Sequence, residues 1–353
     1  MISGIRITRF RGVRDGLLEE LKQLTVLIGK NGAGKSTVLE SLYLISACAN
    51  SKDEVRNVSK LDYVVGRRGG RGSWDGSRRM LWYMGDFEQP IEIQIDVKGK
   101  TFKFLALDLP TSYYPIRLLD ETGSLINLET GYYWRSVEAF KAGEPQMVRG
   151  VGDELLEVKR FLGGFLLIDW LLSKMLSNVE VYAWPRILTK RLDKRVIEII
   201  REEFEPEAEG LTYIPGAEGF NYLALQTTKT AVRVDDLGDG AKAALISSML
   251  ILAYKPTILL VEEPELHMHP AGLYTYTRFL MRLSKEMGFQ IIASTHSIEF
   301  VEMAKALSKD LGIESTVLYI ERENDELKAK SFSLDDVEAL RKLGIDVRLL
   351  DRF

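Results

Sequence analysis

Residues 24–45 read LTVLIGKNGAGKSTVLESLYLI, and this stretch constrains the fold more than any other. Leu24 to Ile28 form a short run rich in β-branched residues, which is typical of a fully buried strand. Gly29 to Ser36 then match the pattern G-x-x-x-x-G-K-[ST], and an amphipathic helical pattern follows. Such glycines let backbone N–H groups turn toward phosphate oxygens at a helix N-terminus. We therefore expect Lys35 to reach the β- and γ-phosphates and the Ser36 hydroxyl to hold Mg²⁺. A chance glycine turn is the alternative.

Two later apolar segments are also predicted to be strands that end in polar side chains. Residues 258–261 are followed by Glu262 and Glu263, and residues 289–293 are followed, after Ser-Thr, by His296. A parallel sheet brings the carboxyl ends of its strands to one edge, where ligands bind. We expect Glu262 to contact Mg²⁺, Glu263 to orient or deprotonate the attacking water, and His296 to hydrogen-bond the γ-phosphate or that water. Solvated carboxylates and a structural histidine are the alternatives.

Residues 234–255, VDDLGDGAKAALISSMLILAYK, predict a helix with a glycine-bearing start. Asp235 or Asp236 can cap it, and Gly238 and Gly240 are expected in its first turn. Glycine residues in the first turn destabilise a helix when no ligand binds its free N–H groups. They are explained if a phosphate group approaches the exposed N–H groups closely.

The order of these motifs resembles the ABC-type ATPase heads of the RecF, Rad50 and SMC class. EEPELHMHP followed by ASTHS looks most like the ATPase module of the OLD (overcoming lysogenization defect) family, and the opening ISGIRITRFRGV is similar to the first strand of those heads. The resemblance covers about residues 1–50 and 230–300 well. It implies an α/β P-loop NTPase fold, an ABC-type ATPase head with an antiparallel β-layer and an inserted helical lobe. It also implies ATP and Mg²⁺ as cofactors and a homodimer that closes around two ATP molecules.

The resemblance implies roles for particular residues. Gly29 to Thr37 resemble the Walker A loop, Glu262 the Walker B acid, and Glu263 the catalytic glutamate. His296 resembles the switch histidine, and Leu237 to Ala241 stand where the signature L-S-G-G-Q/E would, with Gly for Ser and Ala for Gln or Glu. A backbone and helix-dipole contact survives that change. The residues expected at the nucleotide are Gly29, Asn31, Gly32, Ala33, Gly34, Lys35, Ser36, Thr37, Leu237, Gly238 and Gly240, with Lys35, Glu263 and His296 catalytic and Ser36 and Glu262 at the metal.

Two of the three histidines in the chain, His267 and His269, follow the predicted catalytic glutamate at once. Residues 264–269 resemble the D-loop, which in such heads runs along the dimer interface. An H-x-H pair with His296 could also bind zinc. A D-loop role explains the same residues with no extra ion, so we expect an ATP site rather than a metal cage.

The middle of the chain is expected to be an insertion. About 200 residues separate Lys35 from Leu237, more than in transporter subunits, and no heptad pattern of a long coiled coil appears there. Residues 90–109 alternate like a hairpin, and residues 134–207 read as helices. We expect a single ABC-type ATPase domain over 1–353, with a nucleotide-binding core over 1–109 and 210–353 and an inserted, mainly helical lobe over 110–209. The Q-loop glutamine stays unassigned among Gln89, Gln94 and Gln146.

Residues 64–80, VVGRRGGRGSWDGSRRM, form the one local basic cluster. Arginines such as Arg67, Arg68 and Arg71, together with Trp74, are what a nucleic-acid backbone contact would use. A solvated loop, or one that reaches the nucleotide or a partner subunit, is the alternative. The net charge of −4 argues against a nucleic-acid binder that works by bulk charge.

Composition and the chain ends limit the setting. A single cysteine, Cys48, excludes an internal disulfide and a cysteine-based zinc site. The N-terminus lacks the apolar region of a signal peptide, and the most apolar runs are shorter than the roughly 20 residues that span a bilayer. We expect a cytoplasmic protein without membrane contact. Too few residues follow His296 for the Toprim nuclease of full OLD proteins, so we expect the ATPase without the nuclease.

The main hypothesis is an ATPase that dimerises around ATP–Mg²⁺ and couples hydrolysis to DNA or to a partner protein, in genome maintenance or antiviral defence. The partners expected are a second copy of the chain, a nuclease or other effector protein, and DNA. The second hypothesis is a nucleotide-switched interaction protein with slow hydrolysis that controls an effector. The third is a transporter motor, which the length of the insert and the lack of an assigned Q-loop disfavour.

Overall fold

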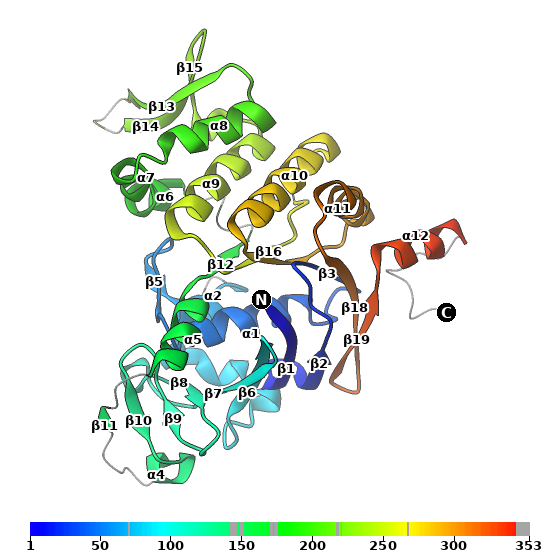
Figure 1. Cartoon of the computed structure of the whole chain (residues 1–353). Coiled ribbons are helices and arrows are strands. Elements are labelled where there is room, and N and C mark those ends of the chain that lie inside the picture. Colours follow the sequence, from blue (N-terminus) through cyan, green and yellow to red (C-terminus); the bar gives the residue numbers. More distant parts are fainter. Residues whose placement is uncertain are drawn as a thin grey trace.

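The computed structural model describes residues 1–343 apart from 70, 142–146, 149–151, 170–171, 173–175, 217–218, 220 and 267. Within these residues fourteen strands form one sheet, in the order β11-β10-β9-β8-β7-β6-β1-β2-β19-β18-β3-β17-β16-β12 (Figure 1). These strands are β1 (Ile2–Phe10), β2 (Val13–Leu18), β3 (Leu24–Ile28), β6 (Ile91–Val97), β7 (Lys100–Ala106), β8 (Ile116–Leu119), β9 (Leu125–Ile126), β10 (Tyr132–Trp134), β11 (Met147–Val148), β12 (Phe165–Ile168), β16 (Ile258–Glu262), β17 (Gln290–Ser294), β18 (Ser315–Glu323) and β19 (Glu326–Phe332).

Two small sheets and the helices complete the described part of the chain. The small sheets are β4 (Lys52–Asp53) with β5 (Val58–Ser59), and β13 (Ala208–Pro215) with β14 (Asn221–Thr227) and β15 (Ala231–Arg233). The helices are α1 (Lys35–Ser46), α2 (Lys60–Gly66), α3 (Trp74–Ser77), α4 (Val137–Lys141), α5 (Asp153–Gly163), α6 (Leu176–Tyr182), α7 (Trp184–Thr189), α8 (Asp193–Glu203), α9 (Asp239–Tyr254), α10 (Pro270–Met287), α11 (Ile298–Leu311) and α12 (Leu334–Lys342). None of these helices combines the length and the apolar character needed to cross a membrane.

The core of the large sheet is parallel. β18, β3, β17, β16 and β12 are neighbours and run in the same direction. On the other side of β19, the strands β2, β1, β6, β7 and β8 pair antiparallel with one another and form the expected β-layer. The chain is thus an α/β protein in which an antiparallel layer continues a parallel core.

Helices cover both faces of the parallel core, so its central strand is buried on both sides. Val26 of β3 packs in the cluster that includes α9, α10 and α11, whereas Leu27 packs in the cluster that includes α1. Every residue of β3 is buried, because successive side chains of a strand point to opposite faces. The continuous apolar run of β3 therefore has the burial that its sequence predicts.

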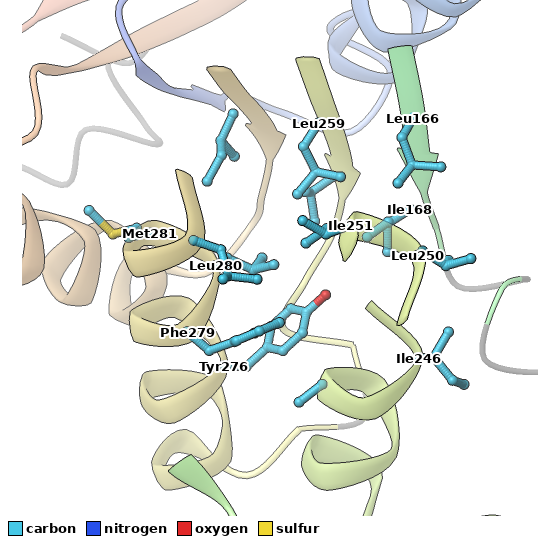
Figure 2. Close-up of a cluster of buried hydrophobic side chains, with 14 of the residues drawn as sticks. Leu166, Ile168, Ile246, Leu250, Ile251, Leu259, Tyr276, Phe279, Leu280 and Met281 are labelled. Carbon is cyan, nitrogen blue, oxygen red and sulfur yellow. The ribbon is translucent and has the colours of Figure 1, made fainter. Parts of the chain in front are cut away.

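Figure 2 shows the packing of α9 and α10 against β16 and β12, with Ile246 and Ile251 of α9 and Phe279 and Leu280 of α10 among the labelled residues. Because Leu280 is 3% exposed, Leu280→Ala is expected to lower the free energy of unfolding by about 2–5 kcal/mol. Tyr274 on the same helix is 38% exposed, so Tyr274→Ala is the matched control, with a change within about 0.5 kcal/mol. Urea denaturation of both variants measures the difference.

The region 110–209 holds the helices α4 to α8, but it also adds strands to the large sheet, which the sequence did not predict. β8, β9 and β10 extend the antiparallel layer, and β12 joins the parallel core beside β16. Residues 165–168 are all buried and lie between Gly164 and Asp169. A short apolar run of this kind cannot be told from a helix by periodicity alone, which explains the discrepancy. The helices α6, α7 and α8 and the sheet β13–β15 are what separates β12 from α9.

Candidate functional site

The predicted phosphate-binding loop lies between β3 and α1 and depends on its glycines. The φ angles of Gly29, Gly32 and Gly34 are 144°, 76° and 111°, in the left-handed region. A Cβ atom at Gly29 would lie 2.2 Å from the carbonyl oxygen of Ile320, and one at Gly34 would lie 2.4 Å from Cδ1 of Leu327. Both close approaches exclude a larger side chain, so the loop is held against the hairpin β18–β19.

Lys35 begins α1 and points its amino group back into the loop. Its Nζ donates to the carbonyl oxygens of Gly29 at 2.8 Å and Lys30 at 3.1 Å. Burial lowers the pKa of Lys35 to about 8, and the charges of Glu263 and Glu265 act against that shift. A desolvated ammonium at a helix N-terminus is suited to bind an anion, because the anion would replace the lost hydration.

The space beside the loop is large enough for part of a nucleotide. A cavity of about 620 Å³ is lined by Lys30, Asn31, Gly32 and Ala33 of the loop and by the end of β18. Ser36 and Thr37 follow Lys35 in the first turn of α1. The loop, its cavity and the helix start therefore agree with a phosphate site.

The carboxyl ends of three parallel strands meet beside this loop, as the sequence predicts. Glu262 at the end of β16 is in register with Ser294 of β17, and Ser294 is in register with Leu27 of β3. The Oγ atom of Ser294 is buried without a hydrogen-bond partner, and so is Oε2 of Glu265. Unpartnered buried polar atoms of this kind mark a place where a water, an ion or a ligand group is expected.

Glu263 adopts an unusual backbone conformation at the strand end. Its φ is 47°, which costs a residue with a side chain about 1–2 kcal/mol, and its N–H donates to the carbonyl oxygen of Ser294 at 2.9 Å. Oε1 of Glu263 lies 3.5 Å from Nε2 of His296. Burial raises the pKa of Glu263, the charges of Glu265 and Glu262 add to this, and Lys35 opposes it. A carboxylate with a raised pKa is a better proton acceptor.

Glu265 fixes the turn that carries His296. Its Oε1 accepts hydrogen bonds from Oγ1 of Thr295 at 2.8 Å and from the backbone N of His296 at 2.7 Å. The sequence analysis gave Glu265 no role beyond its place in the D-loop segment. Its signal was present, since it is the third carboxylate in the run EEPE.

One arginine of the basic segment, Arg67, turns inward, which corrects part of the nucleic-acid hypothesis. Arg67 is 8% exposed and forms ion pairs with Glu40, Asp169 and Glu262. Arg68 forms a bidentate pair with Glu40, at 2.9 and 2.8 Å. The buried Arg67 is therefore not free to contact a nucleic-acid backbone, whereas Arg68, with 47% of its side chain exposed, and Arg71 lie at the surface.

Two of these acids were missed by the sequence analysis, although each had a signal. Glu40 is a fully buried carboxylate on the apolar helix α1. Asp169 follows the buried strand β12, in the same way that Glu262 ends β16, so the end of β12 also carries an acid.

The Q-loop glutamine was left unassigned in the sequence analysis. Gln94, one of the candidates, lies on β6 and donates to Glu92 at 2.7 Å. Gln146 lies outside the described residues.

The signature-like segment begins α9 without a side-chain cap, contrary to expectation. Gly238 is the N-cap residue and makes no side-chain hydrogen bond. Asp236 pairs with Arg233 instead, and Asp235 pairs with Lys242 at 2.9 Å. A cavity of about 380 Å³ is lined by residues of α9, from Asp239 to Ser247, and by Glu262, Glu263 and Pro264. The start of α9 therefore faces the acidic strand end across this cavity.

One of the two D-loop histidines has a structural role. His269 is the N-cap of α10, and its Nδ1 accepts a hydrogen bond from the backbone N of Ala271 at 3.3 Å. His267 lies outside the described residues. The structure thus accounts for His269 without a metal ion.

Comparison with known proteins identifies the class. Residues 1–71 match the family model of an AAA ATPase domain, and residues 175–302 match that of an AAA domain described as "putative AbiEii toxin, Type IV TA system". An OLD nuclease of Thermus scotoductus is 24% identical over 377 residues, which cover 98% of this chain and 68% of the relative. An uncharacterized protein of Methanocaldococcus jannaschii is 31% identical over 113 residues, which cover 32% of this chain and 99% of that protein.

Solved structures agree on the fold. An SMC head bound to the C-terminal winged-helix domain of ScpA matches with a TM-score of 0.55 and 13% identity, over 96% of this chain and 99% of the other. An SMC head domain with an extended coiled coil, bound to the C-terminal domain of ScpA derived from Pyrococcus furiosus, matches with a TM-score of 0.52 and 12% identity, over 97% of this chain and 98% of the other. These similarities support the class of ABC-type P-loop ATPases with OLD-like and SMC-like relatives. The two family models cover the phosphate loop in 1–71 and the acidic strand end in 175–302.

Proposed function

We propose that this chain binds ATP with Mg²⁺, hydrolyses it, and closes into a homodimer around two nucleotides. The observation that carries the proposal is the meeting of a buried lysine and two carboxylates at one sheet edge. Glu263 acts on the pKa of Lys35, and Lys35 acts on the pKa of Glu263, so their charges lie within interaction range. A phosphate held by Lys35 is then within reach of a water held by Glu263.

The chemistry assigned to the chain is an in-line displacement. Glu263 takes a proton from the attacking water, whose oxygen forms a bond to the γ-phosphorus while the bond to the bridging oxygen breaks. Lys35 and the loop N–H groups stabilise the charge on the phosphates. His296, positioned by Glu265, hydrogen-bonds the γ-phosphate or the water. ADP and phosphate leave, and the proton on Glu263 passes to solvent.

The residues present fit a magnesium ion. Mg²⁺ prefers oxygen ligands, and the Ser36 hydroxyl and the Glu262 carboxylate are the groups that would hold it, with phosphate oxygens and water. Glu262 already binds a cationic group in this structure, and a buried Ser294 oxygen without a partner lies beside it. When bound, the ion would neutralise the charge of the β- and γ-phosphates.

A second copy of the chain would complete the site. ATP hydrolysis would be coupled to DNA or to an effector protein, in genome maintenance or antiviral defence. The N–H groups at the start of α9, next to Gly238 and Gly240, support the dimer, because an uncapped helix start attracts phosphate. The exposed residues Arg68 and Arg71 of the basic segment support a DNA contact. Hydrolysis measured with and without DNA separates the hypotheses. Stimulation favours the DNA-coupled ATPase, and near-zero turnover with tight nucleotide retention favours the nucleotide-controlled interaction protein.

Nucleotide binding is expected to take up a proton in mildly alkaline solution. Lys35 has a pKa of about 8 in the empty site, and a bound phosphate raises that pKa, so the complex holds more protons than the free protein. ATP affinity should therefore fall as the pH rises through about 8. Titration calorimetry at about pH 8.5, in two buffers of different ionisation enthalpy, measures the uptake. Lys35→Arg is the control, because its guanidinium stays charged; equal uptake in both proteins would assign the proton to another group.

A further inference from the structure

Arg67 joins three acids that come from three separate elements. Its Nη1 is 3.1 Å from Oε1 of Glu40 on α1, and its Nη2 is 3.3 Å from Oδ2 of Asp169 after β12. The same Nη2 contacts Oε2 of Glu262 at the end of β16. Only 4% of the Arg67 side chain is exposed, so this guanidinium is held inside the predicted nucleotide site rather than on its rim.

Glu262 depends on Arg67 more than the other two acids do. Glu40 is also bound by Arg11 at 2.5 Å and by Arg68 at 2.8 Å. Asp169 is bound by Arg56 at 3.1 Å and by the hydroxyl of Tyr63 at 2.5 Å. Glu262 pairs with no other cation in the described part of the chain. Arg67 can therefore leave Glu262 and still be paired with Glu40 and Asp169, which avoids the cost of an unpaired buried charge.

The predicted metal site and this ion pair need the same carboxylate. A guanidinium and a divalent cation at one carboxylate repel each other strongly when both are removed from solvent. We propose that Arg67 occupies the cation position of Glu262 in the metal-free state, and that Mg²⁺ and Arg67 exclude each other there. The inference rests on the proposed function, because it takes Glu262 as the metal ligand. Arg67 is a positioning residue in this scheme and sets the metal concentration at which the site assembles.

Release of Arg67 has a mechanical consequence for α2. Arg67 is the C-cap residue of this helix, and its backbone N donates to the carbonyl oxygen of Tyr63 at 2.9 Å. α2 is tied to α3 by the backbone N of Trp74, which donates to Oδ1 of Asp62 at 2.7 Å. The side chain of Arg67 anchors the end of α2 to Glu262. A metal that displaces this side chain removes one anchor and should loosen the last turn of α2.

The test measures the binding of Mn²⁺, used in place of Mg²⁺, to the protein with ADP present. The concentration of Mn²⁺ that half-saturates the site, followed by electron paramagnetic resonance, is expected to fall about tenfold in Arg67→Gln relative to wild type. The matched control is Arg79→Gln. Arg79 is 57% exposed in its side chain and pairs with Asp108, away from Glu262, so its substitution should leave the midpoint unchanged. An unchanged midpoint in a folded Arg67→Gln protein overturns the inference.

A measurement on the wild type keeps the inference testable if Arg67→Gln does not fold. Hydrogen exchange in a peptide covering Leu61 to Arg68 should be faster with ADP and Mg²⁺ than with ADP and a chelator. Equal exchange under both conditions, at a Mn²⁺-saturable site, overturns the inference while the proposed function stands. A wild-type protein that binds neither ADP nor metal overturns the proposed function itself, and the inference with it.

Discussion

Lys35→Ala is expected to weaken ATP binding strongly and to abolish hydrolysis without harming the fold. The amino group is buried and held at 2.8 Å from Gly29 O, where its charge would meet the nucleotide phosphates. Loss of its charge-assisted hydrogen bonds should cost about 3 kcal/mol, roughly a hundredfold in Kd. Because burial lowers the pKa of Lys35, the folded state gains little from this charge. The melting temperature should therefore stay the same or rise.

Titration calorimetry with ATP and a thermal melt measure the two sides of this prediction. Lys22→Ala is the matched control, since Lys22 is exposed and lies 3.8 Å from Glu314, away from the loop. It should keep the wild-type affinity. If Lys35→Ala bound ATP as tightly as wild type, the assignment of the phosphate loop would be wrong, whatever happened to hydrolysis.

The parts of the site that the sequence predicted are those encoded locally. β3, its glycine loop and α1 are contiguous, so the residues that form them stand together in the chain. The strand ends at Glu262 and Ser294 were predicted because parallel strands meet at one edge, a rule that needs no knowledge of distant contacts. The hairpin β6–β7 was recognisable from its alternation of apolar and polar residues.

The parts that the sequence did not predict depend on contacts between distant residues. Arg67 stands in a glycine-rich stretch that reads as a solvated loop, yet its acids lie 27, 102 and 195 positions away. A charged residue is buried only where partners surround it, and sequence pattern does not show which partners those are. The strand β12 was not predicted for a related reason, since its pairing partner β16 lies far along the chain. The predicted side-chain cap of α9 is absent because Asp235 and Asp236 form ion pairs with nearby cations instead.

Glu263→Gln is expected to retain ATP and to lose hydrolysis. The substitution keeps the size of the side chain and removes the proton acceptor, so turnover should fall by about 10²–10⁴-fold. Glu209→Gln, on the exposed face of β13, is the matched control and should hydrolyse ATP like wild type. His296→Ala should slow hydrolysis by less, because His296 would position the phosphate or water without activating it. Phosphate release and nucleotide retention are the two measurements.

The same variant tests the composite site. If the start of α9 binds the nucleotide of a second copy, ATP that is not consumed should hold two chains together. Glu263→Gln with ATP and Mg²⁺ should then accumulate as a dimer in light scattering, while wild type returns to monomer as ATP is used. Lys35→Ala should stay monomeric at an ATP concentration well below its raised Kd, because few of its sites then hold a nucleotide. A Glu263→Gln protein that binds ATP and remains monomeric at micromolar concentration contradicts the composite site. The glycines at Gly238 and Gly240 would then serve a head that works alone or with a different partner.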